Sequence, residues 1–597
     1  MNAETRTCQN CKQSFIIEPD DFGFYERIKV PPPTWCPDCR LQRKLMFRNE
    51  RILSKRTCGL CGKNIVSMYA SEAEVPVYCQ NCWWGDGWSP LEYGVEYDFS
   101  RPFFEQFGNL MKRVPLANLN NLNATNSDYC NYTYHSKNCY LNFASDENED
   151  TGYLYHTIDT KNSYDSTGCK NLNLCYEGFY SRHNYSCKYT FFSENCMNSA
   201  FLFDCTNCKN CFGCAGLRNA HHRIFNKQFS EEEYGEEMKK YDLGDYETIC
   251  ATIKRFDEFV LGIPHRYAEN FKTVNSTGDY LSNTKDCIEC FDMEGPIENS
   301  KRIIYSIPDV KDSMDIYGTG AGVELCYEMV GCGLKLQNTA FSVAYEGHSN
   351  RYAFFCRGSN NCFGCVGVRN KEHCILNKQY SKKEYEEILP KIIEHMSATP
   401  YTDMKGRRYG YGEFFPGELS PHAYNETIAQ EFFPITKAQA EAAGYLWRDL
   451  GDKNYSITKK PCDLPSQIEE AGDGIMDEVI GCVHEGKCMH QCATAFKIIK
   501  EELEFYRRMC IPLPRLCPNC RHYERLKKRN PFKLWHRVCA CKGRESGISN
   551  QDLGNTYRNT ATHFHGENPC PNEFETTYSP DRPEIVYCEQ CYQAEVV

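Results

Sequence analysis

Several common sequence features are missing from this chain of 597 residues. It contains no apolar run of about 18 residues, so we expect no membrane-spanning helix and no membrane partner. The opening segment MNAETRTCQNCKQ lacks basic residues followed by an apolar stretch, so we expect no secretory signal and a cytoplasmic location. The GxSxG, P-loop, HExxH and protein-kinase signatures are missing as well. We therefore expect a protein that is not an enzyme.

Cysteine, in contrast, is abundant. The chain has 39 cysteines within a composition that is 41% hydrophobic and 25% charged, which is typical of a folded globular protein. Its length suggests roughly three to five domains. A reducing cytoplasm disfavours extensive disulfide formation. The cysteines should therefore be metal ligands or buried thiols.

The first 85 residues contain four CxxC pairs. A CxxC turn presents two thiolates to one side of a zinc ion, and a second pair completes the tetrahedron. Disulfides and redox dithiols are the alternatives, but four pairs in one short stretch favour metal. The spacing favours ligation by consecutive pairs and leaves a cross-braced arrangement open. We predict two zinc ions, bound by Cys8, Cys11, Cys36, Cys39, Cys58, Cys61, Cys79 and Cys82.

A second copy of this pattern lies near the carboxyl end. FYERIKVPPPTWCPDCRLQRKLMFRN begins at Phe24, and FYRRMCIPLPRLCPNCRHYERLKKRN begins at Phe505, an offset of 481 residues. The closing pairs YCQNCW and YCEQCY match as well. We therefore predict two further zinc sites, about four Zn²⁺ in all, with the ligands Cys488, Cys492, Cys517, Cys520, Cys539, Cys541, Cys588 and Cys591.

The ligands of these two further sites are less regular in spacing. Cys539 and Cys541 depart from the CxxC pattern. A histidine in such a segment is usually an ordinary surface or core residue, yet zinc accepts imidazole as readily as thiolate. The residues that could take part are His563, His565 or Cys570 in place of Cys541, and Cys482, His484 and His490 near the third ion.

The middle of the chain is an internal duplication. NCFGCAGLRN from Asn210 matches NCFGCVGVRN from Asn361, an offset of 151 residues. Short polar and aromatic segments alternate with Asn and Gly, which is typical of many short strands. We predict a mainly β fold: a duplicated right-handed β-solenoid flanked by two homologous double-zinc modules of treble-clef or zinc-ribbon type.

The cysteines of the middle region have two interpretations. A buried free thiol is a small hydrophobe that suits a stacked position inside a solenoid. The cluster of Cys205, Cys208, Cys211 and Cys214 could instead hold a metal. Ser359 stands where Cys208 would recur in the second copy, which favours the stacked thiols.

Three short helices can be read from capping boxes. Ser230 precedes Glu233 by three residues, Ser381 precedes Glu384 in the same way, and a third box begins a helix over 436–444. The first two helices should cap the ends of the solenoid copies. We expect five segments: a double-zinc module at 1–100, solenoid blocks at 101–242 and 243–398, a linker with a short helix at 399–470, and a second double-zinc module at 471–597.

Positive charge is concentrated beside the predicted zinc sites. The whole chain has a net charge of −12, whereas residues 40–56 carry +6 and residues 521–544 carry +8. Such basic segments can contact phosphates, or they can offset anionic zinc–thiolate centres. On the first interpretation the nucleic-acid-binding residues are Arg40, Arg43, Lys44, Arg48, Arg51, Arg521, Arg525, Lys527, Lys528 and Arg529, with Trp35, Phe47, Tyr523 and Trp535 available for stacking.

The segments PRLCPNCRHYERLKKRNPFKLWHR and FFPGELSPHAYNETIAQEFFPITK resemble those of uncharacterised cysteine-rich bacterial proteins known mainly from environmental genomes. The likeness covers most of the chain and implies no established activity. From the residues we predict a zinc-stabilised, non-enzymatic binding protein that recognises RNA or a ribonucleoprotein through basic zinc knuckles. The alternatives are a self-associating architectural scaffold and a polysaccharide-active β-solenoid enzyme.

Overall fold

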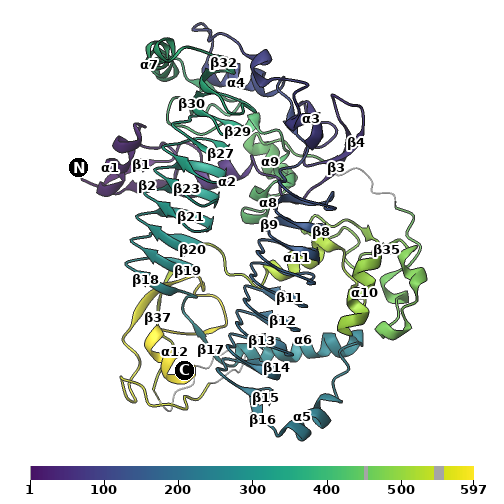
Figure 1. Ribbon diagram of the computed structural model, residues 1–597. Helices are drawn as coiled ribbons and strands as arrows, with labels where there is room; N and C mark the ends of the chain where they lie inside the picture. Colours follow the sequence, from purple (N-terminus) through teal and green to yellow (C-terminus); the bar gives the residue numbers. More distant parts are fainter. Residues whose placement is uncertain (1, 450–454, 544–556, 597) are drawn as a thin grey trace. The chain divides into compact units, whose positions relative to one another are not determined.

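The computed structural model describes residues 2–449, 455–543 and 557–596 (Figure 1). The chain divides into two compact units, Met1–Leu119 with Ala268–Asp449 (unit 1) and Asn120–Tyr267 with Leu450–Val597 (unit 2). Each unit contains one β-solenoid and one cysteine-rich module, so the mainly β fold with a duplicated solenoid is confirmed. In chain order the module comes first in unit 1 and the solenoid comes first in unit 2.

The solenoid of unit 2 is built from coils of twelve residues. Tyr176 pairs in parallel with Lys188, twelve residues later, and Lys188 pairs in turn with Ala200. Pairs of the same spacing continue through the region as isolated bridges. The strands are β7 (Asn131–Tyr134), β8 (Lys137–Tyr140), β9 (Phe143–Asp146), β10 (Glu149–Gly152), β11 (Tyr176–Phe179), β12 (Lys188–Phe191), β13 (Ala200–Phe203), β14 (Lys209–Ala215), β15 (His221–Ile224) and β16 (Lys227–Gln228).

Each coil turns at corners three residues apart. Tyr153, His156, Asp159, Asn162 and Asp165 all have φ between 45° and 59°. Left-handed backbone costs roughly 1–2 kcal/mol for most residues and, after Gly, is best tolerated by Asn and Asp. This requirement explains the many Asn and Asp residues of the repeats, and the stacking of successive coils must offset the remaining strain.

Side chains between the corners point into the solenoid and form ladders. Cys175, Cys187 and Cys211 occupy one ladder and are buried. The thiol of Cys175 donates to the backbone oxygen of Asn184 across 3.4 Å. Burial raises the pKa of Cys175 well above its ordinary value, so the thiol stays protonated. The stacked thiols are therefore part of the core, as the sequence predicted.

The solenoid of unit 1 has longer strands and a more aliphatic interior. Leu281, Ile303, Ile316 and Met329 lie in its core. Its strands are β18 (Phe271–Val274), β19 (Gly278–Lys285), β20 (Cys290–Glu298), β21 (Lys301–Ser306), β22 (Val310–Lys311), β23 (Met314–Thr319), β24 (Val323–Glu324), β25 (Tyr327–Cys332), β26 (Leu336–Gln337), β27 (Val343–Tyr345), β28 (Gly347–His348), β29 (Phe354–Arg357), β30 (Asn360–Phe363), β31 (Glu372–Ile375) and β32 (Lys378–Gln379).

Each solenoid ends in an antiparallel turn followed by a helix. In unit 2 this helix is α5 (Glu231–Met238), and in unit 1 it is α7 (Lys382–Ala398). Both helices begin with the predicted capping boxes, as does α9 (Lys437–Ala443). A further helix of unit 2, α6 (Tyr246–Leu261), was not predicted from the sequence.

The two modules repeat one order of elements: a hairpin, two helices, a second hairpin and a closing strand and helix. In unit 1 these are β1 (Glu4–Thr7), β2 (Ser14–Ile17), α1 (Pro19–Ile28), α2 (Pro37–Leu45), β3 (Ser54–Thr57), β4 (Asn64–Ser67), β5 (Val77–Tyr78) and α3 (Gln80–Trp84). In unit 2 they are β35 (Ile480–Gly481), β36 (Ala495–Phe496), α10 (Lys500–Met509), α11 (Pro518–Leu526), β37 (Trp535–Val538), β38 (Glu573–Thr576), β39 (Ile585–Tyr587) and α12 (Glu589–Val596).

The remaining elements join these parts within their own units. In unit 2, β17 (Pro264–Arg266) pairs with β39, which attaches the carboxyl-terminal module to the end of the solenoid segment. In unit 1 the remaining elements are α4 (Phe103–Met111), β6 (Leu116–Ala117), β33 (Tyr401–Thr402), β34 (Arg408–Tyr409) and α8 (Ile428–Phe432). Among the described residues, no helix combines the length and the apolarity needed to cross a membrane.

Candidate metal centres and the cavity of unit 2

Four cysteine groups share one backbone design. In each group the first cysteine donates its N–H to the carbonyl of the residue two positions after the second cysteine. The four hydrogen bonds are Cys8 to Gln13 at 2.8 Å, Cys58 to Lys63 at 2.8 Å, Cys482 to Thr494 at 2.8 Å and Cys539 to Asn572 at 2.9 Å. This recurring bond identifies equivalent cysteines in the two units even where the loops between them differ in length.

The other two cysteines of each group lie at the start of a helix. Cys36, Cys79 and Cys517 immediately precede α2, α3 and α11. The amino end of a helix carries partial positive charge and presents free N–H groups, which stabilises a thiolate there. Sequence and helix geometry thus place all four sulfurs of a group around one point.

The sulfur positions fit a tetrahedral ion. In each group the four ligand atoms lie within 4.8 Å of one another. Contacts between adjacent sulfurs measure 3.7 Å for Cys11 and Cys36, 3.9 Å for Cys61 and Cys79, 3.9 Å for Cys492 and Cys517, and 3.8 Å for Cys570 and Cys588. Two thiolates bound at ~2.3 Å to a tetrahedral zinc ion would be roughly 3.8 Å apart. The donor set and its spacing therefore suit a metal ion.

The amino-terminal groups contain the residues expected from the sequence, paired consecutively and not cross-braced. Cys8 and Cys11 meet Cys36 and Cys39, and Cys58, Cys61, Cys79 and Cys82 form the second group.

The carboxyl-terminal groups differ from the expected sets by one residue each. The third group is formed by Cys482, Cys492, Cys517 and Cys520, and Cys488 lies in an adjoining group. The fourth is formed by Cys539, Cys570, Cys588 and Cys591, in which Cys570 stands where Cys541 was expected. Loop insertions separate the equivalent cysteines, and lengthening a loop costs little free energy.

Basic residues of α2 are buried against carboxylates of the unit 1 solenoid. Arg40 donates to Asp315 at 2.7 Å, and the ammonium of Lys44 donates to the backbone oxygen of Asp315 at 2.6 Å. Arg43 pairs with Glu328 at 2.6 Å and with Glu413 at 2.8 Å. Burial lowers the pKa of Lys44 to about 8.

Arginines of helix α11 are likewise paired with carboxylates in unit 2, of which two belong to the solenoid and one to α10. Arg525 donates to Asp165 at 2.8 Å and to Glu177 at 3.1 Å, and Arg521 lies 3.3 Å from Glu502. At the module offset of 481 residues, Arg521 and Arg525 correspond to Arg40 and Lys44. In the solenoid repeats, Asp165 matches Asp315 at an offset of 150 residues and Glu177 matches Glu328 at an offset of 151, because the second copy has one residue more between them. The duplicated acidic residues could have been noticed in the repeats, but their basic partners are too distant in sequence to be matched.

These contacts change the interpretation of the basic segments. Of the ten residues expected to contact nucleic acid, six are buried: Arg40, Arg43, Lys44, Arg48, Arg521 and Arg525. Arg51, Lys528 and Arg529 are half-buried, and Lys527 is exposed. Trp35 and Phe47, expected to stack on bases, are buried as well. The buried cations therefore serve as counter-charges to carboxylates of their own unit. Asp315, Glu328 and Asp165 belong to the solenoids, and Glu50, Glu413 and Glu502 lie outside them.

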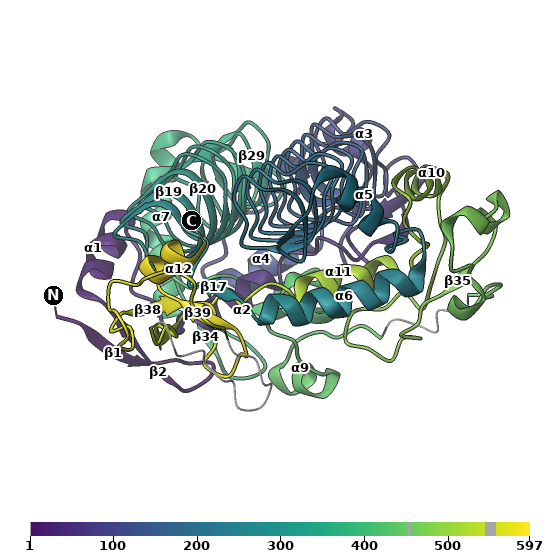
Figure 2. The same cartoon turned by 90° about the horizontal axis from the view of Figure 1, so that it is seen from below.

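Unit 2 also contains a cavity of about 340 Å³ between its solenoid, α6 and α11. Figure 2 shows α6 and α11 beside one another under the solenoid coils. This volume is within the ~300–1,000 Å³ of typical small-molecule sites. The walls include Tyr176, Glu177, Tyr189, Phe191, Phe201, Tyr246, Cys250, Phe256, Asp257, Arg515, Arg521, Glu524, Arg525 and Lys528.

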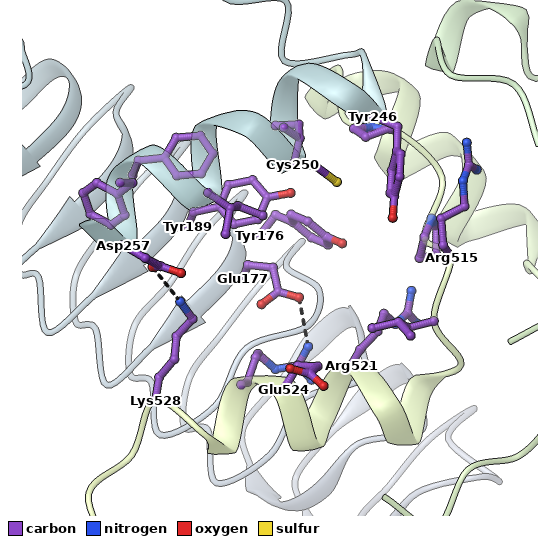
Figure 3. A pocket seen from close by; sticks show the side chains of 18 of the residues that line it. Tyr176, Glu177, Tyr189, Tyr246, Cys250, Asp257, Arg515, Arg521, Glu524 and Lys528 are labelled. Atoms are coloured by element: carbon purple, nitrogen blue, oxygen red, sulfur yellow. Dashed lines mark hydrogen bonds and ion pairs between the residues drawn. The ribbon is translucent and has the colours of Figure 1, made fainter. Parts of the chain in front are cut away.

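Charged groups occupy opposite sides of this cavity (Figure 3). Asp257 and Lys528 pair at 3.2 Å on one side, and Arg515 lies beside Tyr246 on the other. Arg515 stacks on the Tyr246 ring with its guanidinium carbon 4.5 Å from the ring centroid. Burial lowers the pKa of Arg515, which nevertheless stays cationic at neutral pH because a free arginine titrates so high. Burial also raises the pKa of Glu177 to about 7, although Arg525 opposes the shift.

Comparisons with protein-family models, curated proteins and solved structures found no match to this chain.

Proposed function

We propose that this chain is a zinc-stabilised binding protein whose ligand site is the cavity of unit 2. One observation carries the proposal: α11, which begins at a metal-site cysteine, forms one wall of an aromatic cavity that the solenoid completes. A metal ion at the start of α11 fixes the helix, and the helix presents Arg521 and Arg525 to the cavity. The metal ion thus affects ligand binding indirectly, because it fixes the helix that positions these two arginine side chains.

The ions that we assign to the four groups are zinc. Four thiolates at the spacing of a regular tetrahedron are the donor set of structural zinc sites, which keep no open position for a substrate. Soft sulfur ligands also disfavour magnesium and calcium, which prefer oxygen. The metal centres are therefore structural, and the binding of the ions contributes free energy to folding.

The cavity suits a planar aromatic ligand that carries an anionic group. Arg521, Arg525 and Lys528 are each paired with a carboxylate. Arg515 instead donates to the carbonyl oxygens of Leu464 and Pro465, at 3.2 and 2.9 Å. Within the described part of the chain, no carboxylate forms an ion pair with Arg515. An arginine held flat on a tyrosine ring can bind a phosphate or carboxylate while the ring packs against the ligand.

A nucleotide has both of these features, whether free or part of an RNA strand. The aromatic side chains of the cavity offer stacking surfaces for a base, and stacking tolerates any base because each has a π face. We therefore place RNA recognition, if a strand is the source of the nucleotide, at this cavity and not at the buried basic residues of α2 and α11.

The test is a calorimetric titration of the zinc-loaded full chain with uridine monophosphate and, separately, with a short single-stranded oligouridine. We expect binding by wild type and a loss of tenfold or more in R515Q, because a hydrogen bond to a charged group contributes about 1.5–3 kcal/mol. R508Q is the matched control, since Arg508 is an exposed arginine of the same module. Its affinity should equal that of wild type.

The two sources of nucleotide give different outcomes. Binding of both probes with the same loss in R515Q indicates a mononucleotide site, and binding of oligouridine alone indicates that neighbouring nucleotides are required. Cys250 provides a second readout, because its exposed thiol lines the cavity. Bound ligand should slow alkylation of Cys250 in a chain whose exposed Cys462 and Cys510 are replaced by serine. Failure of both probes to bind or to protect Cys250 contradicts the proposal.

A further inference from the structure

The third cysteine group of unit 2 is joined to a second group of possible ligands. His484, Cys488 and His490 lie together with Cys520, and the ligand atoms of these four residues are all within 4.8 Å of one another. Cys520 is at the same time a member of the group formed with Cys482, Cys492 and Cys517. Two four-ligand sets therefore share one sulfur.

The extra ligands enter the structure on an inserted loop. Two residues separate Cys8 from Cys11 in unit 1, whereas nine separate the equivalent Cys482 and Cys492 in unit 2. The N–H of the first cysteine donates to the residue two positions after the second cysteine in both units. The seven additional residues therefore leave this hydrogen bond of the hairpin in place. All three extra ligands, His484, Cys488 and His490, lie within this loop. The insertion therefore adds three of the four ligands of a second coordination sphere.

The side chains of the loop have the geometry of ligands. The sulfurs of Cys488 and Cys520 are 3.7 Å apart, the separation seen between adjacent sulfurs of the four-cysteine groups. The Nδ1 atoms of His484 and His490 are buried and have no hydrogen-bond partner among the residues that the structure describes. A buried imidazole nitrogen without a partner is costly, and a metal ion would satisfy it.

Neighbouring residues hold the second histidine in place. The His490 ring stacks on Tyr523 of α11, with the centroids 5.3 Å apart and the planes 4° from parallel. A carboxylate oxygen of Glu524 lies 3.7 Å from Nδ1 of His490, and the centroid of His484 lies 5.3 Å from that of His490. The stacking contact therefore restricts the orientation of the His490 ring, and Nδ1 stays available as a ligand atom because 3.7 Å is too long for a hydrogen bond to Glu524.

We propose that unit 2 contains a two-zinc centre bridged by the thiolate of Cys520. One ion is bound by Cys482, Cys492, Cys517 and Cys520, and the other by His484, Cys488, His490 and Cys520. A thiolate sulfur keeps lone pairs after it binds one ion, so it can bind a second. The inference rests on the proposed zinc content, and it raises the expected number of ions in this module.

Charge accounting favours the bridged arrangement. A single zinc ion with four thiolates has a formal charge of about −2. Five thiolates, two neutral imidazoles and two zinc ions sum to about −1, so the second ion reduces the charge near the buried start of α11. The unit 1 group has two residues between its first cysteines and therefore no loop to supply a second set.

The experiment counts metal ions per chain by native mass spectrometry of the full chain purified under reducing conditions. The variants are H484A/H490A and, separately, C488S, which leave the four-cysteine set intact. H183A is the matched control, because His183 is an exposed histidine of the unit 2 solenoid. We expect each test variant to lose one zinc ion relative to wild type, and the control to lose none.

The outcomes separate this inference from the proposal on which it rests. Loss of one ion by both variants supports the bridged centre, and retention of the wild-type count by either overturns it while leaving the four-cysteine sites in place. A wild-type chain without zinc removes both proposals. If a variant does not fold, zinc K-edge absorption of wild type decides instead. A metal–metal scattering path with nitrogen ligands supports the bridged centre, and sulfur-only coordination overturns it.

Discussion

Asp315 in unit 1 and Asp165 in unit 2 occupy the same position in the two solenoid copies. Each lies inside a cluster of basic residues from the neighbouring module helix. Burial alone would raise the pKa of Asp315, but Arg302, Arg40 and Lys44 lower it well below the ordinary range. The sequence shows both the acidic and the basic residues, but it does not show that they meet, because 275 positions separate Arg40 from Asp315.

The first prediction concerns D315N. Removing one partner of a buried ion pair leaves the other charges uncompensated, which typically costs about 3–5 kcal/mol. We expect the free energy of unfolding of unit 1 to fall by that order. The measurement is urea denaturation followed by circular dichroism. E387Q is the control, because Glu387 and Lys383 form an exposed pair in α7 that should contribute little. Equal stability of D315N and wild type would contradict the role of the cluster.

Glu177 gives unit 2 a pH dependence whose sign can be derived. Burial raises its pKa from about 4.5 to about 7. Between these values the folded state holds more protons than the unfolded state, so the free energy of unfolding decreases as pH rises. E177Q should show a shallower decrease than wild type between pH ~5 and ~7. Urea unfolding at several pH values tests this, with the exposed Glu504 replaced in E504Q as the control. Parallel curves for E177Q and wild type would exclude the shift.

At the scale of elements, the capping boxes predicted three helix starts correctly, whereas the spacing of apolar residues was not enough to predict a further helix, α6. The capping boxes at Ser230, Ser381 and Thr436 begin helices as expected, because capping depends on neighbours three residues away. Helix α6 was missed although Asp245 caps it and Ile249 and Phe256 form a buried stripe. Its start lacks the complete capping box, because Thr248 stands three residues after Asp245 where the other three helices have Glu or Gln.

Helix α7 provides a prediction at this scale. In S381A the helix loses the hydroxyl that accepts from the Glu384 N–H, and losing such a cap costs about 0.5–2 kcal/mol. Hydrogen exchange of the first-turn amides of α7 should therefore become faster. S397A is the control within the same helix, because the Ser397 hydroxyl donates back to Ile393 and its loss should be neutral or slightly stabilising. Faster exchange in both variants alike would argue against a specific cap.

At the scale of the whole molecule, the two units contain the same kinds of parts in opposite chain order. The offsets of the repeats reveal the duplicated modules and solenoids, but they do not reveal which module packs on which solenoid. That choice depends on buried contacts such as Arg43 with Glu328 and Arg525 with Asp165. A list of consecutive segments cannot describe a unit that is built from two separate stretches of the chain. Residues 399–449 are an example, because Tyr409, Phe414 and Phe415 are buried in the core of unit 1.

The contrast between metal-dependent modules and metal-free solenoids predicts how the molecule responds to the removal of metal. The solenoids are stabilised by coil-to-coil hydrogen bonds and buried ladders, which need no metal. The hairpins that carry Cys8, Cys58, Cys482 and Cys539 depend in addition on the geometry of the metal ligands. A strong zinc chelator under reducing conditions should therefore abolish hydrogen-exchange protection in β1–β4 and β35–β38 first. Protection should persist in β12–β14 and in β21–β25. Re-addition of zinc is the control and should restore the knuckles. Simultaneous loss of protection in modules and solenoids would contradict this prediction. It would show that each unit unfolds as a whole when the metal is removed, because the ion pairs of α2 with Asp315 and of α11 with Asp165 couple the module to the solenoid.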